Sequence, residues 1–110
     1  MTTSNIEIIN TVAIETVLSF DVQAKRWTDT YGNTYFSVVV SAEQEKEYVE
    51  LGAVSFAYGY DEAYAYKAVE IIKETVTGIT SEESSLWRLM DDLKLSCNTK
   101  ATNVKRKKDL

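Results

Sequence analysis

Histidine is absent from the 110-residue sequence, and this absence excludes more than any motif that is present. Histidine is the usual general base, the commonest zinc ligand and the partner of serine or cysteine in nucleophilic enzymes. The glycine-rich loops that hold phosphates and the aspartate-rich loop of calcium sites are missing as well. We therefore expect a protein that is not an enzyme and that carries no cofactor and no metal ion.

Cysteine and long apolar runs are scarce too. The one cysteine, Cys97, rules out an intrachain disulfide and a cysteine-rich metal site, and we expect it to be a small apolar residue near a helix end. No apolar run approaches the roughly 20 residues of a membrane span. The first residues lack the basic segment of a signal peptide. These features predict a cytoplasmic protein without a membrane association.

Charge is divided unevenly along the chain. Residues 1–97 hold seven basic and sixteen acidic side chains, a net charge of −9, whereas residues 98–110 hold five basic and one acidic, a net charge of +4. Because residues 98–110 show no core-forming pattern, we predict one α+β domain over 1–97 and a disordered basic tail over 98–110. The acidic body repels phosphates, but nucleic acid could contact the cations of the tail: Lys100, Lys105, Arg106, Lys107 and Lys108.

Alternation of apolar and polar residues predicts an antiparallel sheet. A hairpin is expected with strands over 17–27 and 34–41, because a Gly-Asn turn separates two alternating runs. A third strand over 48–58 completes a meander, and Gly52 marks a bulge or a close backbone approach within it. Residues 6–17 could add a fourth strand at the edge or form an extended lead-in. The sheet is therefore predicted to have three strands, or four.

Two helices should follow the sheet and pack on one of its faces. The first is expected over about 61–77 with Asp61 as its N-cap, and the second over about 81–96 with a capping box formed by Thr80 and Glu83. The first helix carries an apolar stripe at helical spacing, made of Ala65, Ala68, Val69, Ile72 and Val76.

Aromatic residues gather beside the hairpin turn and beside the junction between the third strand and the first helix. Aromatic rings next to a guanidinium are common in binding sites for proteins and nucleotides. The predicted binding residues are Arg26, Trp27, Tyr31, Tyr35, Tyr58, Tyr60 and Tyr66. Any single tyrosine could instead be a core ring that closes a small domain. The residues expected to be buried are Phe20, Val22, Phe36, Val38, Phe56, Val69 and Ile72.

Three segments carry a resemblance to a known class of proteins: Lys25-Arg26-Trp27, then Gly32-Asn33-Thr34-Tyr35, then Phe56-Ala57-Tyr58-Gly59-Tyr60. A strand that ends in a basic-aromatic pair, a turn that ends in Gly-Asn-Thr-Tyr and a Tyr-Gly-Tyr helix entry resemble small proteins encoded by phages and mobile elements. The resemblance covers about residues 18–75. It implies a phage setting and carries no known active site or ligand.

Three functional hypotheses follow. The first is a small acidic, non-enzymatic binding protein that modulates or inhibits a host protein in the host cytoplasm. The second is a nucleic-acid-binding accessory module that uses the sheet and the basic tail. The third is a protein that sequesters a nucleotide signal in a pocket, between protomers of a homo-oligomer, lined by Arg26, Trp27, Tyr35, Tyr58 and Tyr60.

Overall fold

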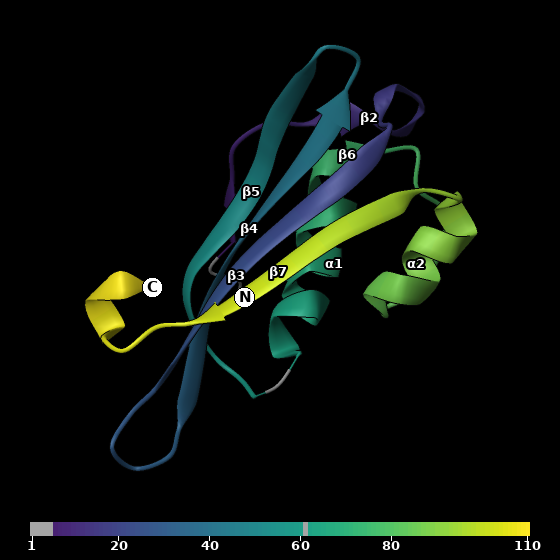
Figure 1. Cartoon of the computed structure of the whole chain (residues 1–110). Coiled ribbons are helices and arrows are strands. Elements are labelled where there is room, and N and C mark those ends of the chain that lie inside the picture. Colours follow the sequence, from purple (N-terminus) through teal and green to yellow (C-terminus); the bar gives the residue numbers. More distant parts are fainter. Residues whose placement is uncertain (1–5, 61) are drawn as a thin grey trace.

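A computed structural model describes residues 6–60 and 62–110 of the chain. Five strands form one sheet in the spatial order β1–β5–β4–β3–β7 (Figure 1). Their bounds are β1 (Ile6–Ile8), β3 (Ser19–Thr28), β4 (Thr34–Gln44), β5 (Glu47–Tyr58) and β7 (Ser96–Asn103). Neighbouring strands are antiparallel except β3 and β7, which are parallel. The α+β class is confirmed, but the prediction of three or four strands was too low.

The predicted meander of β3, β4 and β5 forms the centre of the sheet. The β3–β4 hairpin pairs without interruption from Ser19 opposite Glu43 to Thr28 opposite Thr34. Its turn is held by Asp29, whose carboxylate accepts hydrogen bonds from the backbone N–H groups of Tyr31 and Asn33, each at 2.9 Å. The local hydrogen bonding of one aspartate therefore sets the turn that the Gly-Asn pair predicts.

Strand β5 is irregular where the sequence predicts a bulge. Its register against β4 shifts twice, once near Gly52 and once opposite Ser37. A Cβ at Gly52 would lie 2.9 Å from the Glu7 carbonyl oxygen, so β1 can approach only a glycine here. The second shift turns Phe56 away from the helices, and its ring is half-buried. The prediction of a fully buried Phe56 was wrong because a bulge changes the face of the residues beyond it.

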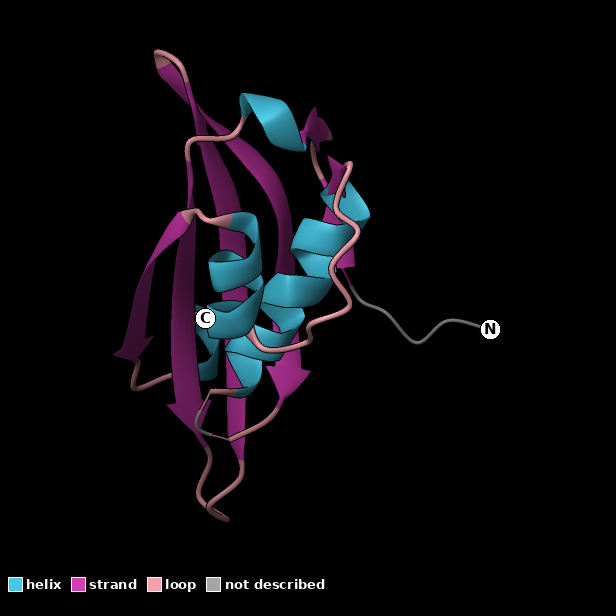
Figure 2. Cartoon of the chain, turned by 90° about the vertical axis from the view of Figure 1, so that its right-hand side faces the viewer, coloured by secondary structure: helices cyan, strands magenta, loops and turns pink. Residues whose placement is uncertain are grey.

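Helices α1 (Ala63–Thr75) and α2 (Leu86–Leu93) cover one face of the sheet (Figure 2). The apolar stripe is buried, with α1 packed against β4 and β5, and apart from Phe56 the residues expected in the core are buried. Within residues 6–60 and 62–110 no α-helix covers the other face, which we call the open face. This one-sided cover explains why apolar residues alternate with polar ones along β3.

The predicted helix caps differ from the structure. Asp61 lies outside the described residues, and Glu62 precedes the first residue of α1. The capping box of Thr80 and Glu83 was wrong, because α2 begins only at Leu86 and Ser85 precedes it. Ser81 instead donates a hydrogen bond to the Asp92 carboxylate at 2.7 Å, which joins the loop before α2 to the end of that helix.

Residues 6–17, which the sequence left undecided, form both an edge strand and a lead-in. After β1 the chain makes the short strand β2 (Val12–Ala13), which pairs in parallel with β6 (Val76–Thr77), and then a single 3-10 turn, η1 (Ile14–Thr16). This small sheet joins the N-terminal segment to the end of α1.

The prediction of a disordered tail over 98–110 was wrong. Residues 98–103 belong to β7, which pairs with β3 along its whole length, and the Val104 N–H donates to the Arg26 carbonyl at 2.7 Å. Residues 104–110, which we call the basic segment, then lie on the side of the sheet away from the helices and end in the 3-10 turn η2 (Lys107–Asp109) (Figure 1). Only alternate residues of β7 face the helices, and among them Cys97 and Ala101 supply the apolar character. Its sequence therefore lacks a core-forming pattern.

Candidate binding surface

The aromatic residues of the hairpin meet at the end of the sheet that carries the β3–β4 turn. Trp27 and Tyr35 are directly opposite each other in the register of β3 and β4, and Tyr58 is opposite Tyr35 on β5. The bulge in β5 brings Phe56 to the same face, and Tyr60 follows just after the strand. We call these five residues the aromatic end: Trp27, Tyr35, Phe56, Tyr58 and Tyr60.

The rings of the aromatic end stack across three strands. Tyr35 lies between Trp27, at a centroid distance of 5.6 Å, and Phe56, at 4.8 Å, with interplanar angles of 28° and 15°. The Lys107 ammonium lies 4.9 Å from the centroid of the Phe56 ring. Tyr58 meets Tyr35 edge-on at 5.4 Å. The faces of Tyr35 and Phe56 are therefore already in contact with neighbours, and these rings present their edges outward.

Hydroxyl groups join this stack to the hairpin turn. The Tyr58 hydroxyl donates to the Tyr60 hydroxyl at 3.1 Å, and the Tyr60 hydroxyl reaches the Gly32 carbonyl at 3.3 Å. The hydrogen bond with Tyr58, together with partial burial, raises the pKa of Tyr60 above its ordinary value. The Tyr60 hydroxyl therefore stays protonated at neutral pH and remains available as a donor or acceptor at the rim of the stack.

The turn itself carries one strongly held carboxylate. Burial acts to raise the pKa of Asp29, but hydrogen bonds from the Asn33 and Tyr31 backbone N–H groups outweigh it and hold the pKa below its ordinary value. Tyr31, at the tip of the turn, is 88% exposed. A charged anchor therefore fixes the turn while its tyrosine projects into solvent.

Six of the seven residues predicted to bind a partner fall into two groups, and the seventh, Tyr31, lies at the tip of the hairpin turn. Trp27, Tyr35 and Tyr58 lie together on the open face, whereas Arg26 and Tyr66 line a hollow of about 610 Å³ beside α1. Tyr60 belongs to both groups, since it lines that hollow and contacts Tyr58. The residues proposed for a single nucleotide pocket are therefore divided between the two sides of the sheet.

Phe56 belongs to the aromatic end and Lys107 contacts its ring, although neither residue was predicted there. Phe56 was assigned to the core because it alternates regularly with Val54, and the bulge that reverses it leaves no mark at that position. The place of Lys107 depends on the direction of β7, which the sequence did not reveal as a strand. A glycine within or near the end of a strand is the local signal that predicts a bulge of the kind seen in β5.

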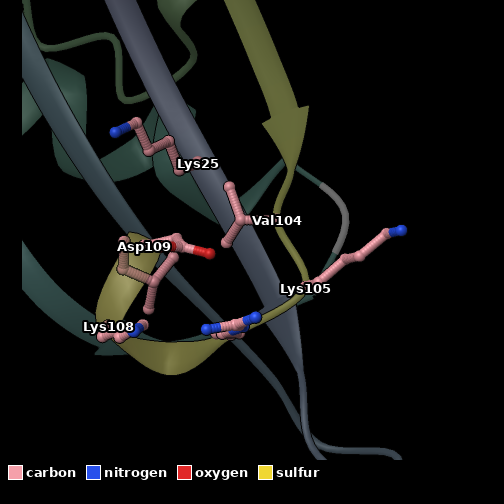
Figure 3. A pocket seen from close by; sticks show the side chains of 7 residues that line it. Lys25, Val104, Lys105, Lys108 and Asp109 are labelled. Carbon is pink, nitrogen blue, oxygen red and sulfur yellow. The ribbon is translucent and has the colours of Figure 1, made fainter.

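Cations of the basic segment form a second feature next to the aromatic end. Lys105, Arg106 and Lys108 line an open hollow of about 780 Å³ together with Lys25 of β3, and Asp109 is the one acidic residue of its lining. Figure 3 shows that the Lys105 side chain extends away from Asp109 and Lys108. The open face is therefore locally basic although the whole chain has a formal net charge of −5.

The described part of the chain offers little catalytic chemistry. Within residues 6–60 and 62–110 there is no group of three or more acidic or cysteine side chains placed to hold a metal ion. Burial, and secondarily the charge of Asp21, raises the pKa of the Cys97 thiol to about 11, which makes it a poor nucleophile at neutral pH. Among the helices described, none has the length and apolar character needed to cross a bilayer.

Comparisons with protein families, with curated proteins and with solved structures find no match for this chain. Functional inference therefore depends on the geometry of the open face.

Proposed function

We propose that this chain is a non-enzymatic binding protein that uses the aromatic end of its sheet, together with Tyr31, to bind a protein partner. The observation that carries the proposal is the gathering of exposed rings at one end of the sheet: Tyr58 is 58% exposed, Tyr60 47% and Tyr31 88%. Exposed apolar side chains that are contiguous, rather than scattered, are typical of interaction surfaces. Tyrosine and tryptophan are also the residues most enriched at protein hot spots.

The geometry of the rings favours a protein over a nucleobase. In proteins that bind single-stranded nucleic acid, each base stacks on the open face of an aromatic ring. Tyr35 has a ring on each side, and Phe56 has Tyr35 and Lys107 as neighbours, so the central rings offer edges instead. Ring edges flanked by the Tyr58 and Tyr60 hydroxyls suit a protein surface, where apolar contacts and a few hydrogen bonds occur together.

The partner's chemistry follows from the charges beside the rings. The basic segment lies next to the aromatic end, and Lys107 contacts Phe56 directly. Cations at the rim of an interface select a partner with acidic side chains there and speed the encounter. We propose a partner surface with an apolar centre and an acidic rim, and the resemblance to phage-encoded proteins points to a host protein in the host cytoplasm.

Capture from a host lysate tests the proposal with matched variants. The intact chain should retain a specific protein, and the Tyr31→Ser/Tyr58→Ser variant should lose it. The control is Tyr48→Ser, because Tyr48 is 64% exposed but lies at the β4–β5 turn, far along β5 from Tyr58. Equal retention by all three chains, or retention that nuclease treatment removes, would contradict a protein interface at the aromatic end.

The basic hollow favours a second candidate, a nucleic-acid-binding accessory module. Lys25, Lys105, Arg106 and Lys108 could each approach a phosphate. Binding to single-stranded DNA should then weaken steeply with salt. The slope of the logarithm of the binding constant against the logarithm of the salt concentration should be about −0.7 for each phosphate contact. Replacing the basic residues of the segment by glutamine should flatten that slope. Absence of any complex at low salt would eliminate this candidate, for which the acidic body is unfavourable.

A further inference from the structure

A separate groove lies in the middle of the open face, beyond the aromatic end. Its cavity measures about 480 Å³ and is lined by residues of β3, β4, β5 and β7, with Leu110 of the basic segment at its side. Pockets of this size accommodate small ligands. The groove shares Lys25 and Leu110 with the basic hollow, but neither functional proposal above accounts for its apolar floor.

The groove exists because small side chains occupy the centre of the open face. Val39 of β4 lies directly opposite Ala53 of β5, and serines follow along both strands at Ser37 and Ser55. Taller side chains surround them, so the centre of the face is hollowed. The floor formed by Val39 and Ala53 is apolar, which suits the flat body of an organic molecule.

Two lysines converge on the groove from neighbouring strands. Lys25 is paired with Thr102 and Lys100 with Gln23, so the two lysines are diagonal neighbours on the same face of β3 and β7. From the spacing between strands and the rise along them, such neighbours are roughly 8 Å apart, close enough for both ammonium groups to reach one anion. The groove lining contains no aspartate or glutamate.

The nearest acid on β3 is Asp21, a diagonal neighbour of Lys100 that does not line the groove and keeps its negative charge. Asp21 precedes Gln23 on the same face, and its carboxylate accepts hydrogen bonds from the Gln23 amide at 3.1 and 3.2 Å. Glu7 of β1 is opposite Ala53 at the far side of the floor, but it does not line the groove. The charged side chains that line the groove are therefore the two lysines, which stand above an apolar floor.

We propose that this groove is a binding site for a small amphiphilic anion, with a flat apolar body on Val39 and Ala53 and a phosphate or carboxylate head between Lys25 and Lys100. Charge complementarity selects the head, because the two charged side chains that line the groove are both lysines, and ammonium groups favour an anion. The apolar floor selects the body, because inorganic phosphate alone would leave it in water. This site is independent of the aromatic end.

Four probes distinguish the need for an anionic head from the need for an apolar body: 2-naphthyl phosphate, 2-naphthoate, neutral 2-naphthol and inorganic phosphate. Calorimetric and NMR titrations of the full chain should show saturable binding of one or both naphthyl anions, with shifts centred on Val39, Ala53 and Ser55. 2-Naphthol and inorganic phosphate should bind at least about tenfold more weakly. The stronger of the two naphthyl anions identifies the head group. Shifts confined to the aromatic end, or equal affinity for all probes, would overturn the proposal.

Substitutions test the residues themselves. Lys25→Gln/Lys100→Gln should weaken binding of the naphthyl anion by at least about tenfold, whereas Lys25→Arg/Lys100→Arg should retain it. Lys73→Gln, an exposed lysine in the last turn of α1, is the charge-matched control and should change nothing. Unchanged affinity in the Gln variant would refute the site.

Substitutions that fill the groove test whether its apolar floor is needed for binding. Ala53→Leu should abolish binding of every naphthyl probe while the melting transition remains cooperative. If that variant does not fold, Ser55→Leu fills the same groove from an exposed position. Undiminished binding in a folded variant would contradict the proposal. The Tyr31→Ser/Tyr58→Ser variant should bind the probes normally, so loss of partner capture and loss of anion binding are separable results.

Discussion

Tyr35 is the residue on which the packing of the aromatic end depends, and its removal should have a measurable cost. The ring contacts Trp27, Phe56 and Tyr58 at centroid distances of 5.6, 4.8 and 5.4 Å. Each such pair contributes about 0.5–1.5 kcal/mol beyond area burial. Because the cluster is only half-buried, we expect Tyr35→Ala to lower the free energy of unfolding by about 2 kcal/mol, near the lower end of the summed range.

Urea unfolding of wild type and variant measures this loss directly, and thermal melting should fall by about 8 °C. A double-mutant cycle with Phe56→Ala isolates the best-stacked pair, for which we expect a coupling energy of about 1 kcal/mol. Tyr31→Ala, at an exposed turn, should stay within about 0.5 kcal/mol of wild type. A Tyr35→Ala loss as small as that of Tyr31→Ala would refute the view that the ring stack contributes to the fold.

Three further predictions concern single positions. Gly59→Ala should lower the free energy of unfolding, measured with urea, by about 2 kcal/mol, because a Cβ there would lie 2.5 Å from the Ala63 Cβ. At Gly32 a Cβ would meet no atom within 4 Å, so Gly32→Ala should lower it by only about 1 kcal/mol, the cost of a positive φ. Cys97 has a pKa of about 11 against an ordinary 9.0, so it should react with a small disulfide roughly tenfold more slowly than a peptide thiol. The lower fraction of thiolate slows the reaction, and the greater nucleophilicity of that thiolate partly offsets the loss. An equal rate would contradict the burial of Cys97. Because the pKa of Asp29 is depressed in the folded chain, its stabilisation should be complete above pH 3.8 and be lost as pH falls through the folded pKa, so wild type and Asp29→Ala should converge in melting temperature only in acid.

The meander could be predicted because its information is local. Alternation in β3 and β4 reflects one covered face and one open face, and the Asp29 turn is encoded within a few residues. The same alternation brought Trp27 and Tyr35 together in the prediction, since paired strands place opposite residues side by side. Local pattern was therefore sufficient for the centre of the sheet and for half of the candidate site.

The remainder depends on non-local pairing. β7 is held by its backbone hydrogen bonds to β3, and of its residues only Cys97 and Ala101 are apolar ones packed against the core, so Ser96–Asn103 gave no strand pattern. The contact between Lys107 and Phe56 requires both the direction of β7 and the bulge in β5. Neither is encoded in the residues next to Lys107, which is why the basic segment was mistaken for a tail.

A photo-crosslink from the turn is the most direct test of a protein interface at the aromatic end. A photoreactive phenylalanine analogue at position 31, activated in host cells that produce the chain, should yield one discrete protein adduct. The same analogue at position 48, at the other end of β5, should yield none or only diffuse products. Equivalent adducts from both positions, or an adduct from position 48 alone, would contradict the proposal that the partner binds the aromatic end.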